Sequence, residues 1–162
     1  MSDATDKDLK YLAMCEFGAG LFSTCAKRQY MAIVLDEFGR VSGMGYNGAP
    51  SGHAHCTDGA CPRMQEQSKS GSSYDNCISI HAEQNAIMYS GGRHTIYVNG
   101  QPCSTCAKLI AGAGFKRVVC IFDDSYIGAQ QTIDMLRSFG IEVCTAEYRE
   151  VISCAATHTV VT

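Results

Sequence analysis

Apolar and polar residues alternate along this chain with periods that predict helices and strands in turn. Apolar side chains recur at helical spacing over residues 9–27, and two strand-like runs, 30–35 and 41–46, follow with a glycine-containing turn between them. Further helices are predicted at 80–89, 104–113 and 129–139, and further strands at 95–98, 117–122 and 141–145. The tail after Ala146 fits either a short helix or frayed residues.

This order of elements indicates an α/β fold. Helices that alternate with strands after an opening hairpin predict a sandwich around one mixed sheet of five strands. No repeat, low-complexity tract or linker divides the sequence, so residues 1–162 are expected to form a single domain. The stretch 47–76 is rich in Gly, Ser, Pro and Asp and lacks periodicity. A loop of this length is expected to be functional or held together by a metal.

Composition and charge narrow the function classes. Of the 162 residues, 46% are hydrophobic and 18% are charged, which is typical of a globular domain with a core. No apolar run is long enough to span a bilayer, and the polar, acidic start resembles neither a signal nor a transit peptide. We therefore expect a cytoplasmic protein with no membrane partner. The formal net charge of −3, without a Lys/Arg cluster, weighs against a nucleic-acid polymer as partner but is compatible with a single phosphate group.

The ten cysteines point to metal binding. Disulfides are rare in a reducing compartment, and cysteines near histidines are typical of metal sites. Four cysteines lie in apolar stretches, where a thiol behaves as a small hydrophobic group, and we interpret them as core residues: Cys15, Cys120, Cys144 and Cys154. The other six lie in or near motif-like segments: Cys25, Cys56, Cys61, Cys77, Cys103 and Cys106.

Two of these segments carry the candidate chemistry. His81 lies at the start of one predicted helix, and Cys103 and Cys106, preceded by Pro102, lie at the start of the next. One histidine and two cysteines provide three zinc ligands and leave the fourth tetrahedral position open for water, as a catalytic zinc site requires. The amides and dipole at a helix N-terminus favour the thiolate form of Cys106. We therefore predict a catalytic zinc site formed by the histidine and the two cysteines.

Glu83 is the candidate proton shuttle. It is two residues from His81, and residues at that spacing do not share a helix face, so we expect it beside a bound water rather than on the metal. A carboxylate in that position can take a proton from the water and deliver it to a substrate. Two other interpretations remain open: Cys103 and Cys106 as a redox CxxC pair, and His81 as a capping or core histidine.

The combination of H-x-E with P-C-x-x-C is much more specific than either part, and it is the signature of the zinc-dependent nucleobase deaminases. The sequence resembles the deoxycytidylate (dCMP) deaminase family, within the cytidine-deaminase-like superfamily, over approximately residues 25–143. The matching stretches are 25–29 (CAKRQ), 45–52 (GYNGAPSG), 81–87 (HAEQNAI) and 102–108 (PCSTCAK). The GYNGxPxG segment separates this family from the deaminases of free nucleosides and adenosine.

The resemblance implies a three-layer α/β/α fold with one catalytic domain, and hydrolysis of dCMP to dUMP and ammonia, which supplies thymidylate synthesis. It implies that Glu83 protonates the pyrimidine ring nitrogen and the leaving ammonia. Family members are typically hexamers that dCTP activates and dTTP inhibits, so it also implies a homo-hexamer and effectors carrying Mg²⁺. The alternatives are another cytosine compound (a modified dCMP or a free nucleoside), a base in nucleic acid, and a zinc-stabilised binding module without catalysis.

The resemblance also assigns substrate-binding roles. Asn47 is assigned to the deoxyribose and pyrimidine, although Asn-Gly is also a common turn dipeptide. Arg28 is the candidate phosphate ligand because a fork of donors suits a phosphate; an exposed arginine after a helix is otherwise simply solvated. Ala82, inside the histidine motif, is included among the substrate-binding residues. Tyr126 falls where the family often has an aromatic residue that closes the pocket, and the other interpretation is an ordinary surface or core tyrosine.

A second, structural zinc is expected from the remaining cysteines of the motif-like segments. These cysteines can tie the first helix, the long loop and the approach to the catalytic histidine together: Cys25, Cys56, Cys61 and Cys77. The resemblance supports such a zinc in some family members, with varying ligands. His53 or His55 can replace one cysteine, and a fold without the second zinc also stays open.

One residue departs from the family pattern. The family commonly has a glycine before the alanine of its first strand, whereas this chain has Met31 before Ala32. The larger side chain either reshapes the floor of the pocket or only repacks the strand. The preference for modified cytosines is therefore left open.

Overall fold

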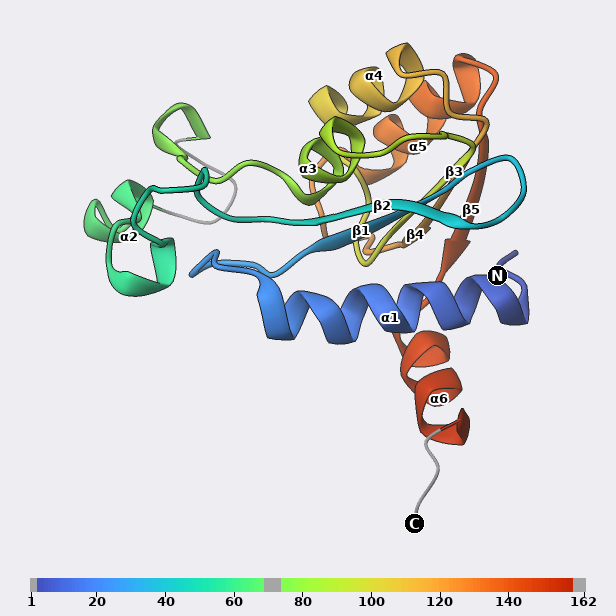
Figure 1. Ribbon diagram of the computed structural model, residues 1–162, viewed down its shortest axis with the longest axis horizontal. Coiled ribbons are helices and arrows are strands. Elements are labelled where there is room, and N and C mark those ends of the chain that lie inside the picture. Colours follow the sequence, from blue (N-terminus) through green and yellow to red (C-terminus); the bar gives the residue numbers. More distant parts are fainter. Residues whose placement is uncertain (1–2, 69–73, 159–162) are drawn as a thin grey trace.

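A computed structural model describes residues 3–68 and 74–158 of the chain, and its centre is one mixed sheet of five strands (Figure 1). The strands are β1 (Met31–Leu35), β2 (Val41–Tyr46), β3 (Thr95–Val98), β4 (Arg117–Ile121) and β5 (Glu142–Ala146). They lie in the order β2-β1-β3-β4-β5. β1 is antiparallel to both β2 and β3, whereas β3, β4 and β5 are parallel to one another.

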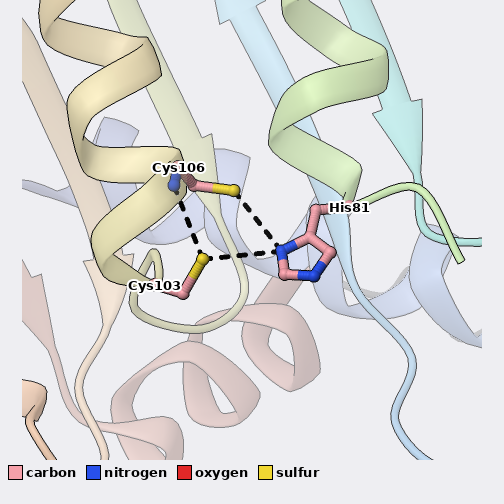
Figure 2. Close-up of side chains that lie close together, drawn as sticks. All are labelled: His81, Cys103 and Cys106. Carbon is pink, nitrogen blue, oxygen red and sulfur yellow. Dashed lines mark hydrogen bonds between the residues drawn. The ribbon is translucent and has the colours of Figure 1, made fainter. Parts of the chain in front are cut away.

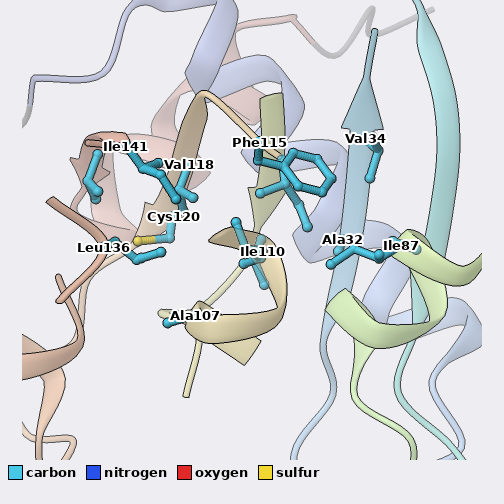
Figure 3. Packing of buried hydrophobic residues seen from close by; sticks show 14 of the residues in the cluster. Ala32, Val34, Ile87, Ala107, Ile110, Phe115, Val118, Cys120, Leu136 and Ile141 are labelled. Atoms are coloured by element: carbon cyan, nitrogen blue, oxygen red, sulfur yellow. The ribbon is translucent and has the colours of Figure 1, made fainter. Parts of the chain in front are cut away.

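Helices cover both faces of the sheet, which confirms the three-layer α/β/α prediction (Figure 1). One face carries α3 (Ala82–Met88), α4 (Ser104–Gly112) and α5 (Ala129–Ser138), and the other carries α1 (Asp6–Phe22) and α6 (Tyr148–His158). All of β1 is buried, because its side chains alternate between the two covered faces. Ala32 and Val34 pack toward α3, α4 and α5 (Figure 3), and Met31 and Ile33 pack toward α1.

Close contact between β2 and α3 depends on glycine. A methyl group at Gly45 would lie 2.4 Å from the backbone nitrogen of Ala86 and 2.7 Å from the carbonyl oxygen of Ala82. Gly43 is similarly close to the end of the same helix, 2.8 Å from Ser90. The two glycines of β2 therefore let α3, the helix that follows His81, lie directly on the edge of the sheet.

The first helix begins and ends earlier than residues 9–27, so those predicted bounds were wrong. Its start is set by a capping box in which Thr5 accepts a hydrogen bond from the Asp8 amide and the Asp8 carboxylate accepts one from the Thr5 amide. The helix ends at Ser23, whose hydroxyl donates hydrogen bonds to the backbone carbonyl and the side-chain oxygen of Asn47. Both helix ends are thus set by polar contacts, which the spacing of apolar residues does not indicate.

In its described residues, 47–68 and 74–76, the predicted loop contains three short helical segments: the 3-10 turns Cys56–Asp58 (η1) and Tyr74–Asn76 (η2), and α2 (Pro62–Gln65). The ambiguous tail forms α6, which packs beside α1. None of the helices in the described residues combines the length and apolar character needed to cross a bilayer.

Candidate active site

The three predicted zinc ligands meet where α3 and α4 begin side by side (Figure 2). His81 is the N-cap of α3, and its backbone N–H donates to the Gln84 side chain over 2.9 Å. Cys103 is the N-cap of α4, and its sulfur accepts a hydrogen bond from the Cys106 amide over 3.5 Å. The His81 Nδ1 atom lies 3.6 Å from the Cys103 sulfur and 3.4 Å from the Cys106 sulfur.

This donor set fits zinc. The ligand atoms of the three residues all lie within 4.8 Å of one another, and no other group of three or more such side chains in residues 3–68 and 74–158 is as close. An imidazole nitrogen and two thiolates are preferred zinc ligands, and three protein ligands leave one tetrahedral position open. The arrangement is therefore a candidate catalytic metal centre rather than a closed structural one.

The site favours the ionised form of Cys103, whereas the prediction that Cys106 is the thiolate was wrong: the hydrogen bond with Cys103, followed by burial, raises the pKa of Cys106 above its usual value. A hydrogen bond from Cys106, together with one from His81, lowers the pKa of Cys103 to about 4. Two helix N-termini point their amides and positive dipole ends at the same place, which stabilises negative charge there. Metal binding needs deprotonated sulfur: Cys103 already favours that form, whereas Cys106 has to lose its proton when a metal binds.

Glu83 lies in the first turn of α3, buried beside the ligand residues. Its carboxylate is in hydrogen-bonding contact with the Cys106 thiol, and burial raises the pKa of Glu83 above its usual value. A raised pKa makes a carboxylate a better proton acceptor, as a group that takes a proton and later returns it requires. The geometry thus brings the predicted proton shuttle to the predicted metal ligands.

Asn47 is connected to the segment that precedes α3. The next residue, Gly48, pairs with Ile80 through two backbone hydrogen bonds of 3.2 and 2.8 Å, and Ile80 directly precedes His81. The Asn47 carboxamide accepts hydrogen bonds from the Ser23 hydroxyl over 2.5 Å and from the Tyr30 amide over 2.8 Å. Its nitrogen donates to a backbone carbonyl over 2.8 Å. Asn47 therefore lies near the metal ligands but is held by the protein itself.

The other substrate-binding candidates differ in burial. Ala82 is fully buried at the first position of α3, between the two motif residues. Arg28 is exposed, and its guanidinium donates to the Tyr30 hydroxyl over 3.4 Å. Tyr126 lies in the turn after β4 and lines a surface hollow of about 460 Å³. The hydrogen bonds that Ser125 donates lower the pKa of Asp123, which precedes that turn, and the positive charge of Arg28 lowers it further.

Two residues at this site were missed by the sequence analysis. Ser23 is buried and fixes the Asn47 side chain, and Tyr30 links Asn47 to Arg28. A serine after a helix and a tyrosine before a strand are both ordinary features, so the sequence carries no signal for either role.

The four cysteines expected to hold a second zinc are neighbours in space. Cys56 and Cys61 are buried and hydrogen-bonded to each other, and Cys25 and Cys77 are close enough to influence Cys56 electrostatically. Burial, followed by these neighbouring sulfurs, raises the pKa of Cys56 to about 11. Their sulfur atoms lie farther apart than the ligand atoms at the first site. His53 and His55, the alternative ligands, are exposed.

Met31 faces away from the metal residues. It is buried in the core beneath α1, and a methyl group at Gly18 of that helix would lie 2.2 Å from the Met31 sulfur. The predicted zinc ligands lie on the opposite face of the sheet, at the starts of α3 and α4. Of the two interpretations of this departure, the structure therefore supports a repacked strand and not a reshaped pocket floor.

Comparison with known proteins agrees with this geometry. The family model described as the cytidine and deoxycytidylate deaminase zinc-binding region matches residues 5–122. The deoxycytidylate deaminase of Schizosaccharomyces pombe is 36% identical over 126 residues, which is 75% of this chain but 38% of that protein. The deoxycytidylate deaminase of Mycobacterium phage D29 is 40% identical over 106 residues, covering 60% of this chain and 80% of that protein.

Solved structures share the fold. The dCMP deaminase of cyanophage S-TIM5, in complex with dCMP and dUMP, aligns with a TM-score of 0.66 at 25% identity, over 88% of this chain and 98% of that chain. Acinetobacter baumannii RibD aligns with a TM-score of 0.59 at 21% identity over 96% of this chain and 39% of that chain, which is a likeness of fold alone.

Proposed function

Because the chain belongs to the cytidine and deoxycytidylate deaminase zinc-binding family, we propose that it hydrolyses dCMP to dUMP and ammonia and so supplies dUMP for thymidylate synthesis. The observation that carries this proposal is the meeting of His81, Cys103 and Cys106 at two helix N-termini, with Glu83 buried beside them. The deoxycytidylate deaminases among the relatives and the dCMP-bound phage structure support the choice of substrate.

The proposed mechanism assigns each step to a residue. His81, Cys103 and Cys106 would hold the zinc ion, which supplies the Lewis acidity that makes water nucleophilic near neutral pH. The water oxygen adds to C4 of the cytosine ring, and the Glu83 carboxylate takes the proton that the water loses. Glu83 gives this proton to the ring nitrogen N3. It then carries the remaining proton of the added hydroxyl to the 4-amino group, which leaves as ammonia as the C4–N bond breaks and the C4=O bond forms.

The proposal includes recognition of the phosphate and the sugar. Arg28 is the candidate phosphate ligand, since it is exposed and its guanidinium can donate two parallel hydrogen bonds to a phosphate. Asn47 is assigned to the sugar and base, Ala82 to the buried floor beside the base, and Tyr126 to closure of the pocket. The assignment of Asn47 is supported by its position next to Gly48, which pairs with Ile80, the residue before His81.

The decisive experiment measures ammonia release from zinc-loaded protein with dCMP, deoxycytidine and 5-methyl-dCMP, each with and without dCTP or dTTP in the presence of Mg²⁺. We expect turnover of dCMP and little of deoxycytidine. Glu83→Gln should lower kcat by about 10²–10⁴-fold with unchanged zinc content by mass spectrometry, whereas Glu37→Gln, in the exposed hairpin turn, should behave as wild type. Failure of all three substrates would move the proposal to another base, and an active Glu83→Gln variant would remove the proton-shuttle assignment.

A second, structural zinc held by Cys25, Cys56, Cys61 and Cys77 is part of the proposal. Its support is the clustering of these sulfurs around Cys56 in an otherwise irregular segment, which a metal would order. Cys56→Ser should lower the zinc content by about one ion per chain and lower the melting temperature. Cys154→Ser, which changes a buried cysteine of α6, should keep the metal content of the wild type. Equal zinc in both variants would exclude the second site.

A homo-oligomer, a hexamer by family resemblance, is also proposed. Its support is a stripe of exposed apolar side chains on α1: Met14, Phe17 and Leu21, which are 55%, 73% and 63% exposed. Such contiguous apolar surface is typical of protein interfaces. Phe17→Glu should reduce the mass measured by light scattering, whereas Phe38→Glu, on the hairpin turn, should not. A monomeric wild type would end this part of the proposal.

A further inference from the structure

We propose that Tyr30 is a positioning residue for the phosphate end of the substrate site, and that it holds the Arg28 guanidinium at a fixed distance from the metal ligands. The inference rests on the proposed function, because it takes Arg28 as the phosphate ligand. Tyr30 is not among the motif residues, and the structure brings it into the site through three separate contacts.

The first contact is with Asn47. Its carboxamide oxygen accepts a hydrogen bond from the Tyr30 amide, and its nitrogen donates to the carbonyl of Arg28, both over 2.8 Å. One buried side chain therefore fixes the backbone of both residues. The start of β1 then directs the Tyr30 side chain to the same face of the sheet as Ala32, where α3 and α4 lie.

The second contact is with the segment that leads to Cys103. A methyl group at Gly100 would lie 2.5 Å from Cε1 and 3.2 Å from Cδ1 of Tyr30, so the ring lies directly against the glycine backbone. Gly100 is three residues before Cys103. Because no side chain separates the ring from this backbone, the position of Tyr30 is set relative to the metal ligands.

The third contact is with Arg28 itself. The Arg28 Nη1 atom donates to the Tyr30 hydroxyl over 3.4 Å. After the hydrogen bonds from Ser125, the positive charge of Arg28 also lowers the pKa of Asp123. The backbone of Asp123 is held by the Gln101 side chain, through hydrogen bonds of 2.8 and 3.0 Å. Tyr30 and Asp123 are thus both in contact with the dipeptide formed by Gly100 and Gln101.

These contacts have a consequence for substrate binding. A free arginine side chain loses rotamer entropy when it binds a phosphate, and one already held in place loses less. Tyr30 therefore strengthens binding of the phosphate without taking part in the reaction at the base. Its removal should raise KM for dCMP and leave kcat almost unchanged.

The test compares Tyr30→Phe, Arg28→Ala and the double variant in zinc-loaded protein, with Tyr148→Phe as control. Tyr148 donates a comparable long hydrogen bond, 3.3 Å to Glu16, outside the site. We expect Tyr30→Phe to raise KM for dCMP about three- to tenfold, with kcat within about twofold, as loss of one hydrogen bond would. Arg28→Ala should raise KM about 10- to 100-fold, and adding Tyr30→Phe to it should have no further effect. Turnover of deoxycytidine, which has no phosphate, should be unaffected by Tyr30→Phe.

The outcomes separate this inference from the proposed function. An unchanged KM for Tyr30→Phe beside a raised KM for Arg28→Ala overturns the inference and leaves the proposed phosphate ligand in place. Additive effects in the double variant also overturn it, since Tyr30 would then act independently of Arg28. An unchanged KM for Arg28→Ala overturns the phosphate assignment and the inference with it, while dCMP turnover by the wild type still supports the proposed reaction.

Discussion

Asp8 provides a quantitative test of how the fold is held together. This carboxylate is 2% exposed beneath the sheet and accepts five hydrogen bonds: from Arg117 over 2.7 and 3.0 Å, from Thr5 over 2.9 and 2.7 Å, and from Tyr97 over 2.9 Å. Burial alone would raise the pKa of Asp8, but the hydrogen bonds from Arg117 and Thr5 outweigh it and hold the pKa well below its usual range. The residue joins α1, β3 and β4.

The change Asp8→Asn should be strongly destabilising. Removing one partner of a buried ion pair costs about 3–5 kcal/mol, because the other charge is left without compensation. Arg117 is 18% exposed and keeps a second carboxylate, Glu142, at 2.9 Å, so the lower end of that range applies. We expect a loss of about 3 kcal/mol at pH 7. For a chain of this length, that loss lowers the melting temperature by roughly 6–12 °C.

The contribution of Asp8 also depends on pH in a fixed direction. Because the folded-state pKa of Asp8 lies below the unfolded value of about 3.9, its stabilisation is complete above about pH 5 and is lost as the pH falls through the folded pKa. The difference in unfolding free energy between wild type and Asp8→Asn, measured in urea, should therefore be constant above about pH 5 and shrink below about pH 4. Zinc loss at low pH affects both proteins and cancels in the difference.

A matched control uses the other carboxylate on the same arginine. Glu142 is 62% exposed, so Glu142→Gln should cost only about 0.2–1 kcal/mol. Equal costs for Asp8→Asn and Glu142→Gln would refute the reasoning, since burial would then not decide the strength of the pair. A difference between wild type and Asp8→Asn that stays the same down to about pH 3 would refute the assigned pKa direction.

Three further predictions follow from the packing and the metal centre. Gly45→Ala inserts a methyl group 2.4 Å from the Ala86 nitrogen, so it should lower the free energy of unfolding in urea by about 1–3 kcal/mol and reduce turnover. Its control, Gly20→Ala, has open space around the new methyl group and should be neutral or stabilising. Equal unfolding free energies for the two variants would contradict the role assigned to Gly45. Met31→Ala should cost about 2–5 kcal/mol but leave the ratio of 5-methyl-dCMP to dCMP turnover unchanged, so a changed ratio would place Met31 in the pocket. Cys103→Ser should abolish turnover with loss of zinc, and an active variant would disprove its role as a ligand.

Short-range signals in the sequence determined most of the secondary structure. The strands Val41–Tyr46 and Thr95–Val98 have their predicted bounds, since each is an apolar, β-rich run that ends at turn residues. The helix after Cys103 begins where predicted, because the residues that cap it are local in sequence. The first helix was misplaced because its limits depend on Thr5 and Ser23, which lie outside the apolar periodicity.

The sequence also predicted which residues form the candidate site. A histidine, two cysteines and a glutamate in two short motifs predicted the ligand types and the proton shuttle, and the structure brings these residues together at two helix starts. It did not determine which histidine nitrogen faces the sulfurs, nor that Glu83 is buried against Cys106. Those properties depend on how α3 and α4 pack against the sheet.

Only the tertiary structure decided which residues surround that chemistry. Met31 and Ala32 are adjacent in sequence but face opposite layers, and the layer that holds the metal ligands is fixed by the strand order β2-β1-β3-β4-β5. Tyr30 meets Gly100, seventy positions later in the chain, because β1 pairs with β3. Periodicity records interactions within a few residues, whereas strand order and helix packing arise from contacts between distant segments, whose free energy depends on the whole core.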